Sequence, residues 1–545
     1  MIYEENVIKK KPMKVNIRFA SVYPNLYRTA MSSLGYQIIY GMINDREDCW
    51  CERVIYPNTR SIESNSPLKD FDIISFTLQY EQDYFNVLEI LKKANIPIKK
   101  KDRECKNDNY PLIIAGGPCA TSNPLPLTDF IDIFIIGEAE VILDKFLNKY
   151  QELNDPKKEI ASFLDIKGIY ISDNPCEKAI VSKMDKAYHV VKPIITKTDD
   201  PKEKKEFSPV FGNSILLNVS RGCTRGCRFC MSGYMYRPIR ETSLKKLLNV
   251  AELARANTDE NKVSLIGAAV SDYSKIDELT HELLERGFQI STPSLRIESI
   301  TDETLTSLKL SGAKTITIAP ESISKLRQSI NKNITNEKIE EVIKNSIELG
   351  LNLKLYFLIG LPNETKEDII ELASYIKYLN SLKYNSQKTT NSKLIPHSNS
   401  IKFSVNPLIP KPHTPLQWEG YDINTMKSKI KYLRSNLKKI AIRFDSAKMG
   451  LLQYVLSCKG KEIGKLLEKS LDLHANKDIN KRINLNDWKK HGNGYNLTDT
   501  LPWNNINIGI SQDFLKTERQ KLFENKLTPW CSEKYCYGCK SCRSK

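Results

Sequence analysis

Short apolar runs alternate with helical patterns along most of the chain, and this alternation restricts the fold more than any other feature. Six strand–helix steps within about 200 residues predict a barrel or partial barrel of parallel strands. In such a fold the functional side chains lie at the carboxyl ends of the strands. The six predicted strands cover residues 214–220, 262–267, 289–295, 314–320, 351–360 and 401–410.

A separate alternation occupies residues 14 to about 150. Its strands are KVNIRFASVYP, CERVIYP, DIISFTLQ, PLIIAGGP and IDIFIIGEAE, with helical patterns such as YFNVLEILKKA between them. This order predicts a doubly wound parallel sheet. The segments AGGP and IGEAE fall at carboxyl ends of strands, where sheets of this kind bind ligands.

The two series predict an α/β chain with five parts. We expect a Rossmann-like domain, a charged linker, a (β/α)6 partial barrel, a helical region and a Cys-rich tail. The polar stretch 380–400 predicts a surface insertion of low complexity. In the order just given, the five parts cover residues 1–170, 171–210, 211–415, 416–500 and 501–545.

Composition narrows the function classes. The formal net charge of +17 is spread along the chain, so it is weak support for an anionic partner such as RNA. No apolar run approaches ~18 residues, which predicts a cytoplasmic protein without a membrane partner. Thirteen cysteines in such a chain indicate metal sites rather than a disulfide framework. Six lie outside the two clusters and read as ordinary buried thiols: Cys49, Cys51, Cys105, Cys119, Cys176 and Cys458.

The first cluster directly follows the strand at 214–220. Cys223, Cys227 and Cys230 have the spacing C-x3-C-x2-C. A structural zinc site closes with four Cys or His ligands, and the loop holds no His. A cubane [4Fe–4S] cluster bound by three thiolates keeps one iron open for a small molecule. Zinc remains the alternative for this motif taken alone.

With Phe229 before its last Cys, the motif resembles the signature of the radical S-adenosylmethionine (SAM) superfamily. The resemblance implies that SAM chelates the open iron. An electron from a reductant such as ferredoxin or flavodoxin then cleaves SAM and generates a radical that abstracts hydrogen. Arg221, Arg225 and Arg228 interleave with the cysteines, and we expect them to offset the charge of the cluster.

Further segments resemble SAM contacts of the same superfamily. Gly360 and Pro362 in GLPNET match the turn near the adenine, and Glu321 in IAPES matches a polar SAM contact. Ser294 and Arg296 are candidates for the SAM carboxylate or ribose. The alternative is that Arg296 and Glu321 pair with each other or with the backbone. The segment LIGAAVSDY departs from the glycine-rich motif of the superfamily, so the amino-group contact stays unassigned.

A closer resemblance extends over nearly the whole chain. The segments MSGYMYRPIRETS, KLYFLIGLPNET and NPLIPKPHTPLQW look like Fe–S oxidoreductases with an N-terminal domain of the cobalamin-binding type. Ligation of cobalt by the protein would need a His in the first loop, and no His precedes His189. We therefore expect a degenerate domain and disfavour cobalamin. Ser75, Gly116 and Gly117 are where a nucleotide tail would approach.

The second cluster is the tail, with the spacing C-x4-C-x2-C-x2-C. Four thiolates suit zinc or a second [4Fe–4S] cluster, and the compact spacing favours the cluster. Its ligands would be Cys531, Cys536, Cys539 and Cys542. Other residues are candidates for substrate contact or for a structural role: Tyr234, Tyr236, Arg237, Arg240 and His413.

Together these features predict a radical SAM enzyme with a [4Fe–4S] cluster and SAM, acting on an unnamed substrate such as RNA or a nucleotide-like molecule. A cobalamin-dependent methyltransferase is the alternative enzyme. A non-catalytic Fe–S or zinc protein that binds RNA or a partner is the alternative from another class. Methylthiotransferases fit less well, since neither their N-terminal cluster domain nor their RNA-binding barrel is visible.

Overall fold

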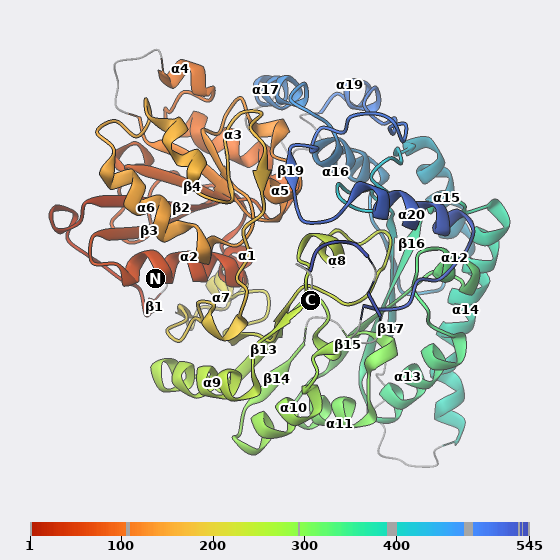
Figure 1. The fold of residues 1–545 in the computed structure, drawn as a ribbon. Helices are drawn as coiled ribbons and strands as arrows, with labels where there is room; N and C mark the ends of the chain where they lie inside the picture. The colour runs from red at the N-terminus through yellow and green to blue at the C-terminus, as the bar shows by residue number, and fades with distance from the viewer. Residues whose placement is uncertain are drawn as a thin grey trace.

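The computed structural model describes residues 3–104, 110–292, 295–389, 400–473, 483–531, 535–536 and 538–542. Parallel sheets and covering helices make up most of this part (Figure 1), which confirms the predicted α/β class. Ser294 and Cys105 lie outside the described residues. No helix in the described ranges combines the length and apolar character needed to cross a bilayer.

The N-terminal part folds into one six-stranded sheet with the order β3-β2-β4-β5-β6-β7. All five strands predicted from the first alternation are present and parallel, and β7 adds an antiparallel edge. The strands in sheet order are Cys49–Ile55, Ile17–Tyr23, Ile73–Thr77, Leu112–Gly116, Ile133–Ile135 and Ile169–Tyr170.

The side chains of this sheet enter two separate cores, because successive residues of a strand point to opposite faces. In β2, Phe19 and Tyr23 join one core with helices α2 (Leu34–Asp45) and α6 (Leu143–Glu152). Ala20 and Val22 join the other, which includes α3 (Tyr84–Lys93). That second core continues through the remaining sheets and the C-terminal helices, so the N-terminal sheet packs directly on the rest of the molecule.

The second alternation forms two parallel sheets. One has the order β10-β13-β14 and the other β15-β16-β17-β18. Leu295 N donates to Thr317 O at 3.0 Å, which joins the segment after β14 to β15. Each of the six predicted segments contains a strand, and β18 (Ile442–Phe444) is an unpredicted seventh. The other six are Ile215–Asn218, Lys262–Ile266, Gln289–Ser291, Thr315–Glu321, Asn352–Ile359 and Ile401–Pro407.

Residues 171–210, predicted as a linker, contain regular structure that pairs with distant parts of the chain. Strand β8 (Cys176–Glu177) pairs with β19 (Ile506–Asn507), and β9 (Ile195–Lys197) pairs with β1 (Tyr3–Glu5). Helix α7 (Pro201–Phe207) begins at Asp200, whose side chain accepts from Lys202 N. Strand pairing therefore holds residues 171–210 against segments near the N-terminus and near the C-terminus.

The helical pattern after the second strand series corresponds to helices. They are α15 (Ile423–Asn436), α16 (Ala447–Cys458), α17 (Ile463–Leu473) and α19 (Leu485–Lys489). Helix α20 (Gln512–Phe523) was not predicted and lies in the part expected to be a Cys-rich tail. Helix α14 (Lys366–Thr389) includes the first half of the predicted insertion, and residues 390–399 lie outside the described part. Figure 1 shows the C-terminal end returning to the middle of the molecule beside α8 (Met231–Met235).

Candidate active site

The first cysteine cluster lies in the loop between β10 and α8. Cys223 and Cys227 are buried, at 6% and 8% exposure, and Cys230 is half-buried. Gly222, directly before the first thiol, has φ +89°, and a Cβ there would meet Pro238 O at 2.6 Å. Glycine is therefore required at this turn, since other residues would combine backbone strain with a clash.

One guanidinium reaches two of the three thiols. Arg296 Nη1 lies 3.8 Å from Cys223 Sγ, and Arg296 Nη2 lies 3.7 Å from Cys227 Sγ. The backbone N–H of Arg225 also donates to Cys223 Sγ at 3.4 Å. Burial and the two neighbouring thiols raise the pKa of Cys230 to about 12. A cation and an N–H donor are therefore already in place for thiolate ligands that burial alone disfavours.

The interleaved arginines have a different role from the one expected. Arg225 binds Asp272 through two hydrogen bonds of 2.8 and 2.9 Å. Arg228 is fully buried and pairs with Glu518 at 3.1 Å. Their charges are neutralised by carboxylates, so these side chains fix the loop instead of leaving free cations for the cluster.

Asp272 also holds the arginine that contacts the thiols. Its Oδ2 lies 3.6 Å from Arg296 Nε, and Glu298 Oε1 lies 3.3 Å from Arg296 Nη2. The backbone N–H of Arg296 donates to Ser271 Oγ at 2.9 Å. The segment after β13, whose role the sequence left unassigned, therefore positions Arg296.

The number of thiols fits a cluster better than a structural zinc ion. A structural zinc site closes with four ligands. Three thiolates on a cubane cluster leave one iron open. Cys223, Cys227 and Cys230 are therefore the residues that could hold a [4Fe–4S] cluster with one open iron.

The residues predicted to contact SAM lie in structured positions. Glu321 ends β15 with φ +66°, and its Oε1 accepts from Lys332 Nζ at 3.0 Å. Gly360 has φ +87°, and a Cβ there would lie 1.9 Å from Met426 Cε. Phe229 packs half-buried on the core. Arg296 and Glu321 have other partners and do not pair with each other, and the SAM contacts themselves remain predictions, as does that of Pro362.

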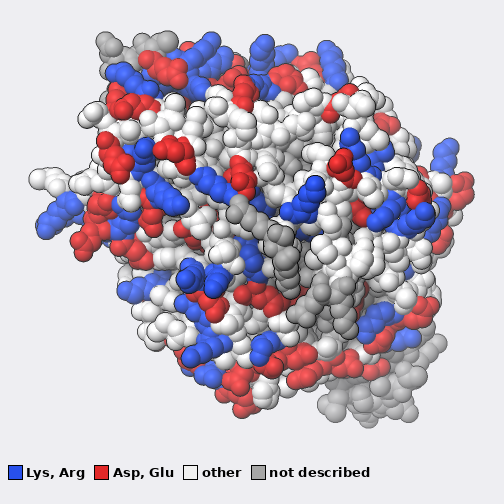
Figure 2. All heavy atoms as spheres, in the orientation of Figure 1, with Lys and Arg blue, Asp and Glu red and all other residues white. Residues whose placement is uncertain are grey.

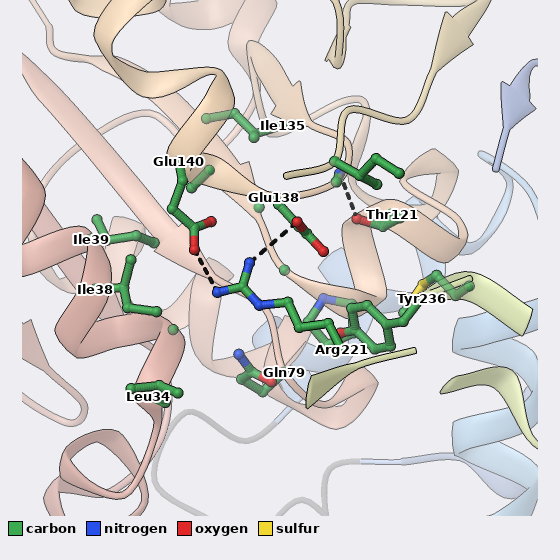
Figure 3. Close-up of a pocket in the computed structure, with 18 of the residues that line it drawn as sticks. Leu34, Ile38, Ile39, Gln79, Thr121, Ile135, Glu138, Glu140, Arg221 and Tyr236 are labelled. Atoms are coloured by element: carbon green, nitrogen blue, oxygen red, sulfur yellow. Dashed lines mark hydrogen bonds and ion pairs between the residues drawn. The ribbon is translucent and has the colours of Figure 1, made fainter. Parts of the chain in front are cut away.

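A cavity of about 340 Å³ separates the cysteine loop from the N-terminal sheet. Its sheet side contains Ser75, Thr77, Gly116 and Gly117 at the carboxyl ends of β4 and β5. Apolar side chains of α2 form a further wall, and Figure 3 shows Leu34, Ile38 and Ile39 there. The opposite side is formed by the cysteine loop, α8 and the end of β13, including Arg221, Gly222, Ser232, Tyr236 and Gly267.

Charged residues of the cavity wall are paired across the two parts of the chain. Arg221 lies between Glu138 and Glu140 in Figure 3, at 3.2 and 2.5 Å. Arg240 donates twice to Glu138 at 2.9 Å. Burial favours the neutral acid, but Arg240 and Arg221 outweigh it and hold the pKa of Glu138 below its usual range. The predicted ligand segment IGEAE therefore ties the N-terminal sheet to the cysteine loop.

One polar group in the cavity wall has no partner. Thr77 is 5% exposed, and its Oγ1 makes no hydrogen bond to the described residues. A buried hydroxyl without a partner costs about 1–3 kcal/mol, which a bound ligand can recover. Among the described residues, no His lines the cavity.

Four of the five remaining candidates are structural. Tyr234 donates to Gly226 O at 3.3 Å, and Arg237 donates to Arg225 O at 2.9 Å, so both hold the cysteine loop. Arg240 pairs with Glu138, as described above. His413 is buried with its Nε2 2.9 Å from Ser122 O, outside the cavity lining. Tyr236 alone of the five lines the cavity.

The tail cysteines lie against the same loop. Cys531 N donates to Thr224 O at 3.1 Å, and Arg237 Nη1 lies 3.5 Å from Cys539 Sγ. Burial and the thiols of the other three tail cysteines raise the pKa of Cys542. The cysteines outside the two clusters are buried within the described chain, as predicted: Cys49, Cys51, Cys119, Cys176 and Cys458.

Comparison with known proteins agrees with this arrangement. A family model described as radical SAM proteins, N-terminal, matches residues 35–172, and a radical SAM superfamily model matches residues 217–376. The uncharacterized protein MJ0966 of Methanocaldococcus jannaschii is 32% identical over 458 residues, covering 83% of this chain and 90% of that protein. The chain belongs to the radical SAM superfamily. It is therefore an enzyme, and the resemblance inferred from the cysteine motif is confirmed.

More distant similarities are to proteins named as methyltransferases. The uncharacterized methyltransferase PH0819 of Pyrococcus horikoshii is 22% identical, covering 50% of this chain and 59% of that protein. The methyltransferase TsrM of Kitasatospora setae, solved with cobalamin and a [4Fe-4S] cluster, has a TM-score of 0.51 at 12% identity, covering 74% of this chain and 77% of that one. The expectation that disfavoured cobalamin is therefore not supported.

Proposed function

We propose that this radical SAM enzyme holds its [4Fe–4S] cluster on Cys223, Cys227 and Cys230 and cleaves SAM reductively to modify its substrate. The observation that carries the proposal is the buried trio of thiols after β10 with the Arg296 guanidinium 3.7–3.8 Å from two of them. When loaded, such a site supplies the electron that splits SAM into methionine and a 5′-deoxyadenosyl radical. In this assignment the sheets β10-β13-β14 and β15-β16-β17-β18 form one partial barrel around the cluster site.

The chain's own residues prepare this site. Arg296 offsets thiolate charge, and Ser271 and Asp272 hold it in place. Gly360, in the turn that resembles the adenine contact of the superfamily, has φ +87°, a conformation that favours glycine. Cys223 and Cys227 are buried at 6% and 8% exposure, which limits the access of water that radical chemistry must avoid.

We further propose that the cavity admits the second reactant, with cobalamin as the first candidate. It lies at the carboxyl ends of a parallel sheet, where such folds bind ligands, and it opens beside the cysteine loop. Gly116 and Gly117 leave room there for a nucleotide tail, and Thr77 Oγ1 is free to bond it. Because the lining has no His, cobalamin would bind without an imidazole ligand.

Cobalamin binding can be measured without turnover. Titration of the purified chain with hydroxocobalamin should give saturable binding and an absorption spectrum that lacks the shift of imidazole ligation. Thr77→Val preserves the shape of the side chain and should weaken this binding by about tenfold, the value of one hydrogen bond. If neither protein binds cobalamin, the cavity receives the substrate itself.

The cluster assignment is tested by anaerobic reconstitution with iron and sulfide, followed by dithionite and SAM. Cys227→Ala should reduce 5′-deoxyadenosine formation by at least about 1,000-fold, since the electron source is lost. Cys49→Ala removes a buried thiol from β3 and is the matched control that keeps SAM cleavage. Equal cleavage by the Cys227 variant and the control would overturn the assignment.

A further inference from the structure

The cysteine-rich tail is packed against the loop that carries the first cysteine cluster. The backbone N–H of Cys531 donates to Thr224 O at 3.1 Å, between Cys223 and Cys227 in sequence. The guanidinium of Arg225 lies over the ring of Trp530. The tail therefore packs directly on the cysteine loop.

A single buried side chain connects the two cysteine sets. Arg237 is 3% exposed and donates to Gly233 O at 2.8 Å and to Arg225 O at 2.9 Å, on either side of Cys227 and Cys230. Its Nη1 lies 3.5 Å from Cys539 Sγ. A guanidinium in contact with a thiol favours the thiolate form that metals bind.

The tail thiols range from buried to exposed. Cys539 is 4% exposed and faces Arg237, Cys531 is half-buried, and Cys536 and Cys542 are exposed. Gly538 has φ +71°, and its backbone N–H donates to Cys536 Sγ at 3.4 Å. The four cysteines therefore range from a buried position beside the cysteine loop to exposed positions on the protein surface.

We propose that Cys531, Cys536, Cys539 and Cys542 hold a second [4Fe–4S] cluster, through which electrons enter the catalytic site. Full thiolate ligation leaves no iron open, so this site suits electron transfer rather than SAM binding. One electron passes from an external protein donor to the exposed side of the tail and from its buried side to the first cluster. The donor is oxidised, the first cluster is reduced, and no bond forms or breaks.

Zinc is the competing metal for four cysteines, because four thiolates also close a tetrahedral zinc site. A second cluster is the closer match to the chemistry of the neighbouring loop. Counts of iron, sulfide and zinc in the reconstituted protein distinguish the two metals.

The metal site can be tested independently of SAM chemistry. The full-length triple variant Cys223→Ala, Cys227→Ala, Cys230→Ala lacks the proposed catalytic ligands and is reconstituted anaerobically. It should retain about four irons and four sulfides, against about eight of each in the wild type, and give a reduced-cluster EPR signal that SAM does not change. A triple variant with no iron, or with one zinc per chain, would overturn the proposal.

The entry of electrons rests on the proposed function and needs a second measurement. Cys536→Ser combined with Cys542→Ser removes the two exposed ligands. We expect the ratio of flavodoxin-driven to dithionite-driven 5′-deoxyadenosine formation to fall at least about tenfold, because a small reductant does not depend on the tail. The Cys49→Ala variant should keep the wild-type ratio. An unchanged ratio in the double variant overturns the entry route, whereas no SAM cleavage in the wild type with either donor overturns the proposed function instead.

Discussion

The loop after β10 and the C-terminal tail each present cysteines to the same region, but they differ in exposure and in what neutralises them. Cys223 and Cys227 are buried and contact Arg296, whereas Cys536 and Cys542 are exposed. An open iron that generates a radical must be protected from water. A site that exchanges electrons with another protein must be reachable from outside. The two environments match these two requirements.

Carboxylates neutralise the arginines around the inner set. Asp272 binds Arg225, Glu518 binds Arg228, and Glu298 binds Arg296, which contacts the thiols. On the face shown in Figure 2, lysines and arginines are interspersed with acidic residues, so the charge of +17 forms no continuous basic surface there. That pattern favours a small-molecule substrate in the cavity over an extended RNA on this face.

The largest expected difference between the inner loop and the tail is in how much a substitution lowers the stability of the protein. Asp272→Ala leaves the buried Arg225 without its carboxylate, removes one of two carboxylates from the half-buried Arg296, and should lower the free energy of unfolding by about 3–5 kcal/mol. Trp530→Ala removes a half-exposed ring from Arg225 and should cost only about 0.5–1 kcal/mol. Urea denaturation of both variants measures the difference. Equal losses would mean that the tail is as much a part of the folded core as the inner loop.

The sequence predicted the strands and the superfamily's cysteine motif because both depend on local information. Alternating apolar runs define buried parallel strands wherever they occur, and thiol spacing defines a metal motif. Strand β18 was missed because Ile442–Phe444 is only three residues long and partly exposed. Ser294, predicted to contact SAM, lies outside the described residues.

The partners of the cysteine loop could not be predicted, because they come from distant parts of the chain. Asp272 lies 47 residues after Arg225, and Glu518 lies 290 residues after Arg228. Which carboxylate meets which arginine depends on how the loops at the strand ends pack. The polar residues after β13 were a usable signal, because side chains at the carboxyl ends of barrel strands are commonly functional. Nothing in the tail's cysteine spacing indicated that Arg237 would reach Cys539.

Acid should weaken a contact between the N-terminal part and the segment after β17. Burial lowers the pKa of His413 to about 4, and its Nε2 lies 2.9 Å from Ser122 O in α5 (Pro118–Ser122). Between pH 6.5 and 4 the unfolded chain binds a proton that the folded chain does not, so stability is lost as the pH falls.

From pH 7 to pH 5 the His413 contribution to the loss should be about 2 kcal/mol. His413→Gln removes the titrating group, so its unfolding free energy should fall by that much less over the same range. Urea unfolding of both proteins at the two pH values gives the comparison, because the other titrating groups cancel. Parallel pH dependences of the two proteins would show that His413 is not responsible.

The finest distinction between the two cysteine sets is electrostatic, because each set is contacted by a different arginine. Arg296→Gln keeps a nitrogen donor near Cys223 and Cys227 but removes the positive charge. Loss of a nearby cation disfavours the added electron, so the potential of the first cluster should fall by about 60 mV, a tenfold change in a one-electron equilibrium. Arg237→Gln should lower the potential of the proposed tail cluster in the same way, because Arg237 contacts Cys539.

Redox titrations followed by EPR separate the two signals by their response to SAM. Independent shifts would establish that the two sites are tuned separately, whereas a common shift in both variants would show that one electrostatic environment governs them.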